Sequence, residues 1–344
     1  MSILHSTTAI VNRLLAPFDV EIVRKSHVEC FRNACLLLDE RRDEALLPNG
    51  AAEYLRWDNS RLTELRARYK DVLPPSLASS RWTEDYTART IDLKFFRSHN
   101  AYVFSDSNWE FKFALTAYYA RLIDDLHLFT VLSEDGLFGC PMLALDATLC
   151  VSRDLLDSIF ELHFLERVLR ISSRPELRIL DIGAGYGRLA HSYAKAMPSS
   201  GVYLCTDVVP ESTFLSEYYL RYRGVDSSAR VVPFDVLERT LGETPIDLAI
   251  NIHSFSECTL QAISWWVDLL RRHGVRYLMV VPNAQDHGGT KLMTQESGGG
   301  SLDFLPLLES CGYELVEKQP KYSAPIVQKY GLSPTYHYLF ELQR

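Results

Sequence analysis

Residues 179–190 read ILDIGAGYGRLA, a short apolar run that turns into a loop with glycine at every second position. Gly183, Gly185 and Gly187 allow a sharp backbone turn and let a ligand approach the main chain closely. The helix expected after the loop offers free N–H groups in its first turn. The stretch therefore predicts a strand, a ligand-binding loop and a helix, in this order.

The spacing of these glycines differs from that of a nicotinamide-binding fingerprint. The pattern G-x-G-x-x-G would need glycine at the position of Arg188. A carboxylate, Asp181, also precedes the first glycine by two positions. It suits a ligand with an ammonium group better than a pyrophosphate, because two anions repel each other.

From residue 178 onward, short apolar runs alternate with helical ones. The expected strands are 178–182, 202–206, 230–234, 247–252 and 277–281, and the expected helices are 189–197, 211–222 and 259–272. Nearly continuous apolar strands that alternate with helices indicate a parallel sheet with helices on both faces. Two last strands, 313–318 and 336–342, follow each other without a long helix, so we expect them to be antiparallel.

The first half of the chain has a mainly helical pattern, and the change falls near residue 172. Its clearest amphipathic runs are 109–130 and 154–171, with Ser152 as a helix N-cap. We therefore divide the chain into a helical cap, residues 1–171, and a sheet domain, residues 172–344. The cap would select the substrate or form a dimer interface. Its aromatic residues, Trp82 among them, could stack on sugar rings, although most such residues belong to the core.

Composition narrows the class of protein. The chain has 344 residues, 47% hydrophobic and 23% charged, which is typical of globular proteins. Its net charge of −8 and the lack of a basic stripe predict no nucleic-acid partner. Seven cysteines without a CxxC pair indicate reduced thiols. Arg13 interrupts the apolar stretch near the N-terminus, and no segment approaches the roughly 18 apolar residues that span a bilayer. We expect a cytoplasmic protein without a membrane partner.

Two more carboxylates stand at the ends of the next expected strands. Asp207, twenty positions after Gly187, could accept both ribose hydroxyls of a bound nucleoside, a device that adenosyl and nicotinamide cofactors share. Asp235, with the backbone of Val236, could read the edge of an adenine. Together with Asp181, these carboxylates would line one rim of the sheet.

In this order and spacing, ILDIGAGYG, TD and FDV resemble the class I Rossmann-like methyltransferases that use S-adenosylmethionine. The resemblance covers about residues 165–344 and implies a seven-stranded sheet with an antiparallel last hairpin. It also implies that residues 172–344 bind S-adenosylmethionine: Asp181 and the glycine loop hold the methionine part, Asp207 the ribose, and Asp235 with Val236 the adenine. The cofactor-binding residues expected on this basis are Asp181, Gly183, Ala184, Gly185, Tyr186, Gly187, Asp207, Asp235, Val236 and Asn251. With NIHSFSE at 251–257, the motif is similar to bacterial sugar O-methyltransferases.

The segment 251–257 should face the transferred methyl group, because it leaves the sheet where the strand order reverses. It lacks the NPPY-like tetrad of amino-group methyltransferases, which favours a hydroxyl acceptor. A hydroxyl needs a general base, and the ordinary pKa of histidine, about 6.5, suits this task. We therefore predict His253 as the base and Glu257 as the partner of its other ring nitrogen. The predicted reaction is O-methylation of a sugar or glycosylated metabolite.

Other interpretations stay open. A nicotinamide-dependent sugar dehydrogenase or epimerase is one, although Arg188 and the lack of a Tyr-x-x-x-Lys pair count against it. A non-catalytic subunit that binds S-adenosylmethionine is another. Asp286 and His287 could gather around Mg²⁺ with Glu257, but no ligand spacing demands a metal, so we predict none. His99 and Asn100 could reach the substrate from the first half.

Overall fold

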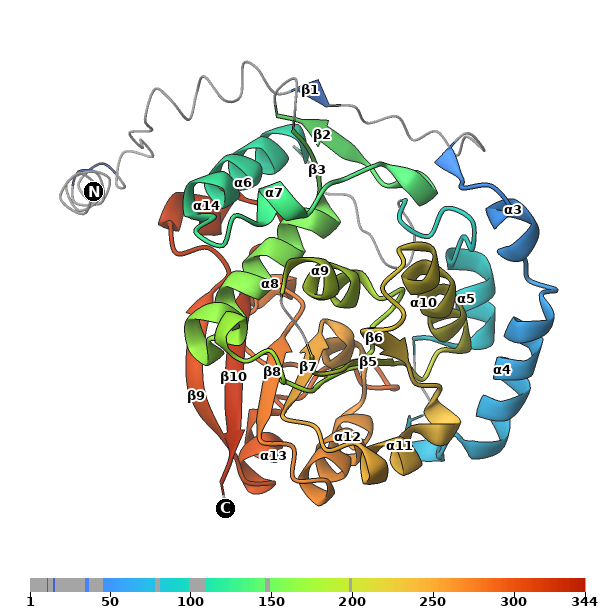
Figure 1. Cartoon of the computed structure of the whole chain (residues 1–344). Helices are drawn as coiled ribbons and strands as arrows, with labels where there is room; N and C mark the ends of the chain where they lie inside the picture. The colour runs from blue at the N-terminus through green and yellow to red at the C-terminus, as the bar shows by residue number, and fades with distance from the viewer. Residues whose placement is uncertain are drawn as a thin grey trace.

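A seven-stranded sheet forms the centre of the computed structural model, which describes residues 11, 15, 35–36, 46–77, 81–98, 109–145, 149–197 and 200–343 (Figure 1). Its strands are β4 (Ile179–Ile182), β5 (Tyr203–Thr206), β6 (Ala229–Val231), β7 (Leu248–Ile252), β8 (Tyr277–Val281), β9 (Tyr313–Pro320) and β10 (Tyr336–Leu342). They lie in the order β6-β5-β4-β7-β8-β10-β9. β4 to β8 are parallel, whereas β10 is antiparallel to both β8 and β9. The predicted Rossmann-like fold, with its antiparallel hairpin, is confirmed.

Helices cover both faces of this sheet, which explains why β4 and β5 are buried at every position. α8, α9 and α10 lie on one face, and α11, α12 and α13 on the other (Figure 1). The bounds of these helices are α8 (Arg153–Leu169), α9 (Arg188–Ala196), α10 (Pro210–Tyr222), α11 (Leu237–Glu243), α12 (Leu260–Arg272) and α13 (Leu305–Ser310). The last helix, α14 (Pro325–Tyr330), lies between β9 and β10 in the chain.

α8 precedes residue 172 but packs directly against α9 of the second half. Ser152 caps it as predicted, since its side chain accepts a hydrogen bond from the Leu155 N–H at 3.0 Å. Arg188, the residue that replaces a fingerprint glycine, donates two hydrogen bonds of 2.8 and 2.9 Å to the buried Glu161 of α8. Arg188 thus connects the two halves of the chain. The domain boundary between residues 171 and 172 stays a prediction.

The described parts of the first half are helical, with one small sheet. The helices are α3 (Ala51–Tyr54), α4 (Ser60–Val72), α5 (Glu84–Thr90), α6 (Trp109–Ile123) and α7 (Leu128–Val131), and the sheet contains β1 (Cys35–Leu36), β2 (Met142–Ala144) and β3 (Cys150–Ser152). The single helix expected at 109–130 is therefore wrong. The chain breaks after α6 because the Asp124 carboxylate accepts the N–H groups of Leu128 and Phe129, at 2.8 and 3.0 Å, and starts α7.

The connections include short 3-10 helices, of which four matter for the site. They are η3 (Pro75–Leu77), η6 (Phe234–Val236), η7 (Ser254–Glu257) and η8 (Gln285–His287), which hold candidate site residues or line the cavity, while η4 (Leu137–Gly139) and η5 (Ile171–Ser173) do neither. Within the described ranges, no helix combines the length and the apolar character that crossing a bilayer requires.

Candidate functional site

A cavity lies at the carboxyl ends of β4 and β7, where the strand order reverses and open α/β sheets bind their ligands. Eight of the predicted site residues line it: Asp181, Gly183, Ala184, Gly185, Tyr186, Asp207, His253 and Glu257. The other four, Gly187, Asp235, Val236 and Asn251, do not belong to this lining. His99 and Asn100 lie outside the described residues.

The first and third glycines of the loop have different roles. Gly183 has a φ of 70°, and a side chain there would place its Cβ 2.3 Å from the Ser254 hydroxyl oxygen. Gly187, at a φ of 87°, instead packs against Ser216 and Leu220 of α10. Gly183 therefore allows η7 to approach the end of β4, whereas Gly187 allows α9 and α10 to approach each other.

Asp181 is buried in β4, and its carboxylate accepts a hydrogen bond from the Tyr203 hydroxyl at 2.9 Å. Burial raises the pKa of Asp181 to about 7, because the cost of burying a charge outweighs this hydrogen bond. A cationic group in the cavity would favour the charged carboxylate. The geometry thus fits the predicted ammonium-binding role.

Asp207 follows β5 and holds the glycine loop in place. Its carboxylate accepts the N–H groups of Gly185 at 3.1 Å and of Val209 at 2.9 Å. Burial nevertheless raises the pKa of Asp207 to about 7. Two buried carboxylates with raised pKa values in one cavity are typical of a binding or catalytic site.

Two side chains of α4 contact the predicted adenine-binding segment, although the Oδ1 atom of Asp235 keeps no hydrogen-bond partner among the described residues. Arg68 donates hydrogen bonds of 2.6 and 2.9 Å to one oxygen of Asp235. The Tyr69 hydroxyl accepts the Phe234 N–H at 2.9 Å, directly before Asp235. Adenine recognition by Asp235 and Val236 stays a prediction, and the structure places both residues beneath α4 and outside the cavity lining.

Asn251, the first residue of the predicted segment 251–257, is completely buried. Its side chain donates to the Ile182 carbonyl at 3.0 Å and accepts the Phe255 N–H at 2.9 Å. These bonds tie η7 to the end of β4. Asn251 therefore positions η7 next to the cavity without lining it.

His253 directly follows β7, and its backbone is strained. Its φ of 66° is rare for a residue with a side chain, and its N–H donates to the Val281 carbonyl at 2.7 Å. The imidazole lines the cavity, and its Nδ1 has no hydrogen-bond partner among the described residues. Burial, together with the Arg153 charge, lowers the pKa of His253 to about 3. The ring is therefore neutral at physiological pH.

The expected contact between Glu257 and His253 is not formed among the described residues. Glu257 instead accepts hydrogen bonds from Arg81 at 2.9 Å and from the Trp82 indole at 2.7 Å. The expectation assumed an α-helix, where residues four apart share a face. The segment forms the 3-10 helix η7, in which residues three apart align, so Glu257 turns toward the first half of the chain.

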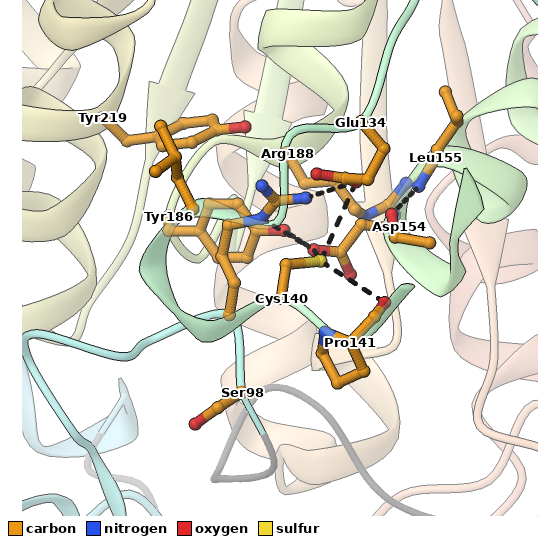
Figure 2. A network of polar contacts seen from close by, with 12 residues as sticks. Ser98, Glu134, Cys140, Pro141, Asp154, Leu155, Tyr186, Arg188 and Tyr219 are labelled. Atoms are coloured by element: carbon orange, nitrogen blue, oxygen red, sulfur yellow. Dashed lines mark hydrogen bonds and ion pairs between the residues drawn. The ribbon is translucent and has the colours of Figure 1, made fainter. Parts of the chain in front are cut away.

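A buried polar network connects the glycine loop to the first half (Figure 2). The Tyr186 hydroxyl donates to Asp154, which also accepts a hydrogen bond from Arg97 at 3.1 Å. Arg97 binds Glu134 as well, at 2.8 Å. These three residues, Arg97, Glu134 and Asp154, come from separate segments of the chain. No local sequence motif therefore predicts their connection to the glycine loop, and none of them was among the predicted site residues.

No group of three histidine, cysteine or carboxylate side chains is arranged as a metal site within the described ranges. Asp286 and His287 lie in η8 and do not line the cavity.

No family model and no curated protein matches this chain. An S-adenosylmethionine-dependent methyltransferase from Aquifex aeolicus is 16% identical, with 52% of this chain and 89% of that chain covered, at a TM-score of 0.38. Magnesium protoporphyrin IX methyltransferase from Synechocystis PCC 6803, solved with bound S-adenosylmethionine, is 12% identical, with coverage of 56% and 85% and a TM-score of 0.37. A 4+2 cyclase, SpnF, is 17% identical, with coverage of 56% and 83% and a TM-score of 0.38. Similarity at this level is no basis for assigning an activity.

Proposed function

We propose that this protein transfers the methyl group of S-adenosylmethionine to a hydroxyl of a sugar or glycosylated metabolite. One observation carries the proposal: the glycine loop, the buried carboxylates Asp181 and Asp207, and the neutral His253 share one cavity at the reversal of strand order. The motif resemblance supports the choice of cofactor and acceptor.

The residues present fit this cofactor. Its ammonium group would offset the cost of burying a charged Asp181, and its ribose hydroxyls would donate to Asp207. Gly183 and Gly185 leave the main chain open to close approach. When bound, S-adenosylmethionine supplies a methyl group activated by a positively charged sulfur.

The acceptor hydroxyl must lose its proton as the new carbon–oxygen bond forms, and His253 is our candidate for the base. Its ring is neutral and lines the cavity, but a pKa of about 3 makes it a weak base, so in this proposal the bound acceptor must raise that pKa before His253 takes up the proton. The Asp157 carboxylate, which lines the same cavity, favours the imidazolium that results, whereas the charges of Arg153, Lys321 and Arg188 disfavour it. Asp157, which already pairs with Lys321 and Arg153, would offset part of this positive charge in place of Glu257. Alignment of oxygen, methyl carbon and sulfur would contribute further rate.

We call the part of the cavity next to His253, where the acceptor would bind, the acceptor end, and it is polar. Arg153, Asp154 and Asp157, all from the first two turns of α8, line it beside His253. Side chains of this kind hydrogen-bond hydroxyl-rich ligands, which supports a saccharide acceptor. In this proposal the first half of the chain helps to select the acceptor.

Calorimetry and a methyl-transfer assay test the proposal. Titration with S-adenosylhomocysteine should show binding, whereas binding of NADH alone would overturn the proposal in favour of a dehydrogenase. With radiolabelled S-adenosylmethionine and a panel of saccharides, His253→Ala should lower turnover by about 10²- to 10⁴-fold. Its affinity for S-adenosylhomocysteine should stay within about twofold, and His273→Ala, outside the cavity, should behave as wild type. Unchanged turnover in His253→Ala would remove His253 from the proposed role.

A further inference from the structure

The first half of the chain supplies part of the wall of the cavity that we propose holds the cofactor. Leu77, at the end of η3, and Trp82, shortly after it, both line this cavity. η3 packs against α12, whose residues Ala262 and Trp266 line the same cavity. Val208, directly after Asp207, belongs to the lining too. An apolar wall therefore forms near the predicted ribose-binding carboxylate, with contributions from both halves.

The Trp82 ring is held from two sides. Its indole Nε1 donates to the Glu257 carboxylate at 2.7 Å, and Arg81 donates to the other oxygen of the same carboxylate at 2.9 Å. Tyr86 meets the ring edge to face, with centroids 5.6 Å apart and planes at 89°. Glu257 is itself 7% exposed, so this anchor lies inside the protein. A large aromatic surface is thereby fixed at the cavity before any ligand binds.

Unlike Trp82, the residues expected to bind the adenine edge do not line the cavity. Arg68 holds Asp235, and the cavity lining includes neither Asp235 nor Val236. An adenine in this cavity would thus meet apolar and aromatic side chains near Asp207. Base rings stack on aromatic side chains without regard to hydrogen-bond pattern, and such stacking strengthens binding by about 5- to 150-fold.

We propose that Trp82 forms the aromatic wall against which the adenine ring of the cofactor packs. The inference rests on the proposed function. Trp82 is then a cofactor-binding residue, not a stacking platform for the acceptor sugar. The first half of the chain completes the cofactor site as well as shaping the acceptor end.

Calorimetry on the full chain tests this assignment with two ligands. S-adenosylhomocysteine carries the whole cofactor skeleton, whereas 5′-methylthioadenosine carries the adenine and ribose without the amino acid part. Trp82→Ala should weaken both by the same factor, at least about fivefold. Trp82→Phe, which keeps an aromatic face, should stay within about threefold of wild type, and Trp82→Leu, which keeps apolar bulk, should resemble Trp82→Ala. Trp57→Ala is the matched control, because Trp57 belongs to the same half but lies outside the cavity.

The outcomes separate this inference from the proposed function. Wild-type affinity for both ligands in the alanine and leucine variants would overturn the role of Trp82 and leave the methyltransferase proposal standing. The same holds if the variants change only the KM for the acceptor. A wild-type protein that binds neither ligand would overturn the proposed function and this inference with it. If Trp82→Ala does not fold, as judged by circular dichroism, the leucine and phenylalanine variants decide between these outcomes.

Discussion

Binding of S-adenosylhomocysteine should weaken as the pH falls below 7, because Asp181 must be charged to face the ligand's ammonium group. Burial raises the pKa of Asp181 to about 7 in the ligand-free protein, so at lower pH most of the carboxyl groups are neutral. The ligand's amino group stays protonated between pH 5.5 and 7.0, since such groups have pKa values near 8 or above. Each binding event at low pH must therefore remove a proton from Asp181, which lowers the affinity.

Proton linkage gives the magnitude. With a ligand-free pKa of about 7 and a bound pKa several units lower, the affinity at pH 5.5 should be about 16-fold below that at pH 7.0. Burial raises the pKa of Asp207 to about 7 as well. If the bound ribose favours the charged form of Asp207, the loss of affinity between pH 7.0 and 5.5 is multiplied by up to about 16 again. Below pH 6, log Kd should rise by about one for each unit that the pH falls and for each such group, so the magnitude of the slope approaches one per group.

Calorimetry between pH 5.5 and 7.5 measures this slope. Asp181→Asn should reduce it by about one, and Tyr203 can still donate its hydroxyl proton to the amide oxygen of the new side chain. The ligand 5′-methylthioadenosine lacks the ammonium group, so its affinity should not carry the contribution of Asp181. An affinity for S-adenosylhomocysteine that is constant over this range, or an unchanged slope in Asp181→Asn, would refute the reasoning.

Two more substitutions probe the framework of the site. Arg188→Ala leaves the buried Glu161 without its two hydrogen bonds from Arg188, so the free energy of unfolding in urea should fall by about 3 to 5 kcal/mol. The exposed control Arg272→Ala should lose about 1 kcal/mol or less, and equal losses in the two variants would contradict this reasoning. Gly183→Ala brings a Cβ to 2.3 Å from the Ser254 hydroxyl oxygen of η7 and should lower the affinity for S-adenosylhomocysteine, measured by calorimetry, by more than about tenfold. The control Gly274→Ala has a similar φ of 63° but lies in open space, so it should bind this ligand as the wild type does.

Local patterns predicted the sheet well. β8 and β10 have the expected bounds, because each is rich in aromatic and apolar residues and lies next to polar or turn residues. The glycine loop was equally visible, since the positive φ values of Gly183, Gly185 and Gly187 are a local demand that glycine meets best. The expected parallel sheet also predicted that Asp181 and Asp207 lie at one cavity, because the carboxyl ends of parallel strands meet at the same edge of the sheet.

Contacts between distant segments could not be predicted in this way. Nothing near Glu257 in the sequence signals that Trp82, 175 positions away, donates to it. The Asp235 carboxylate looked free for adenine because its partner, Arg68, stands in a helix of the other half. The break after α6 was hidden for a different reason: Asp124 fits a helical pattern, and only its bonds to the next turn show that it starts a new helix.

The bonds between α4 and the sheet domain also set an order of events during synthesis. Arg66, Arg61 and Arg68 pair with residues that lie 145, 156 and 167 positions later in the chain. At about 5 to 20 residues per second, α4 is synthesised roughly 7 to 33 s before these partners exist. During that interval the arginines are hydrated, but Leu62, Leu65 and Tyr69 of the same helix, which are buried in the folded protein, have not yet met their partners. The apolar face of α4 is thus covered only when α10 has been synthesised, and the arginine pairs form at the same stage.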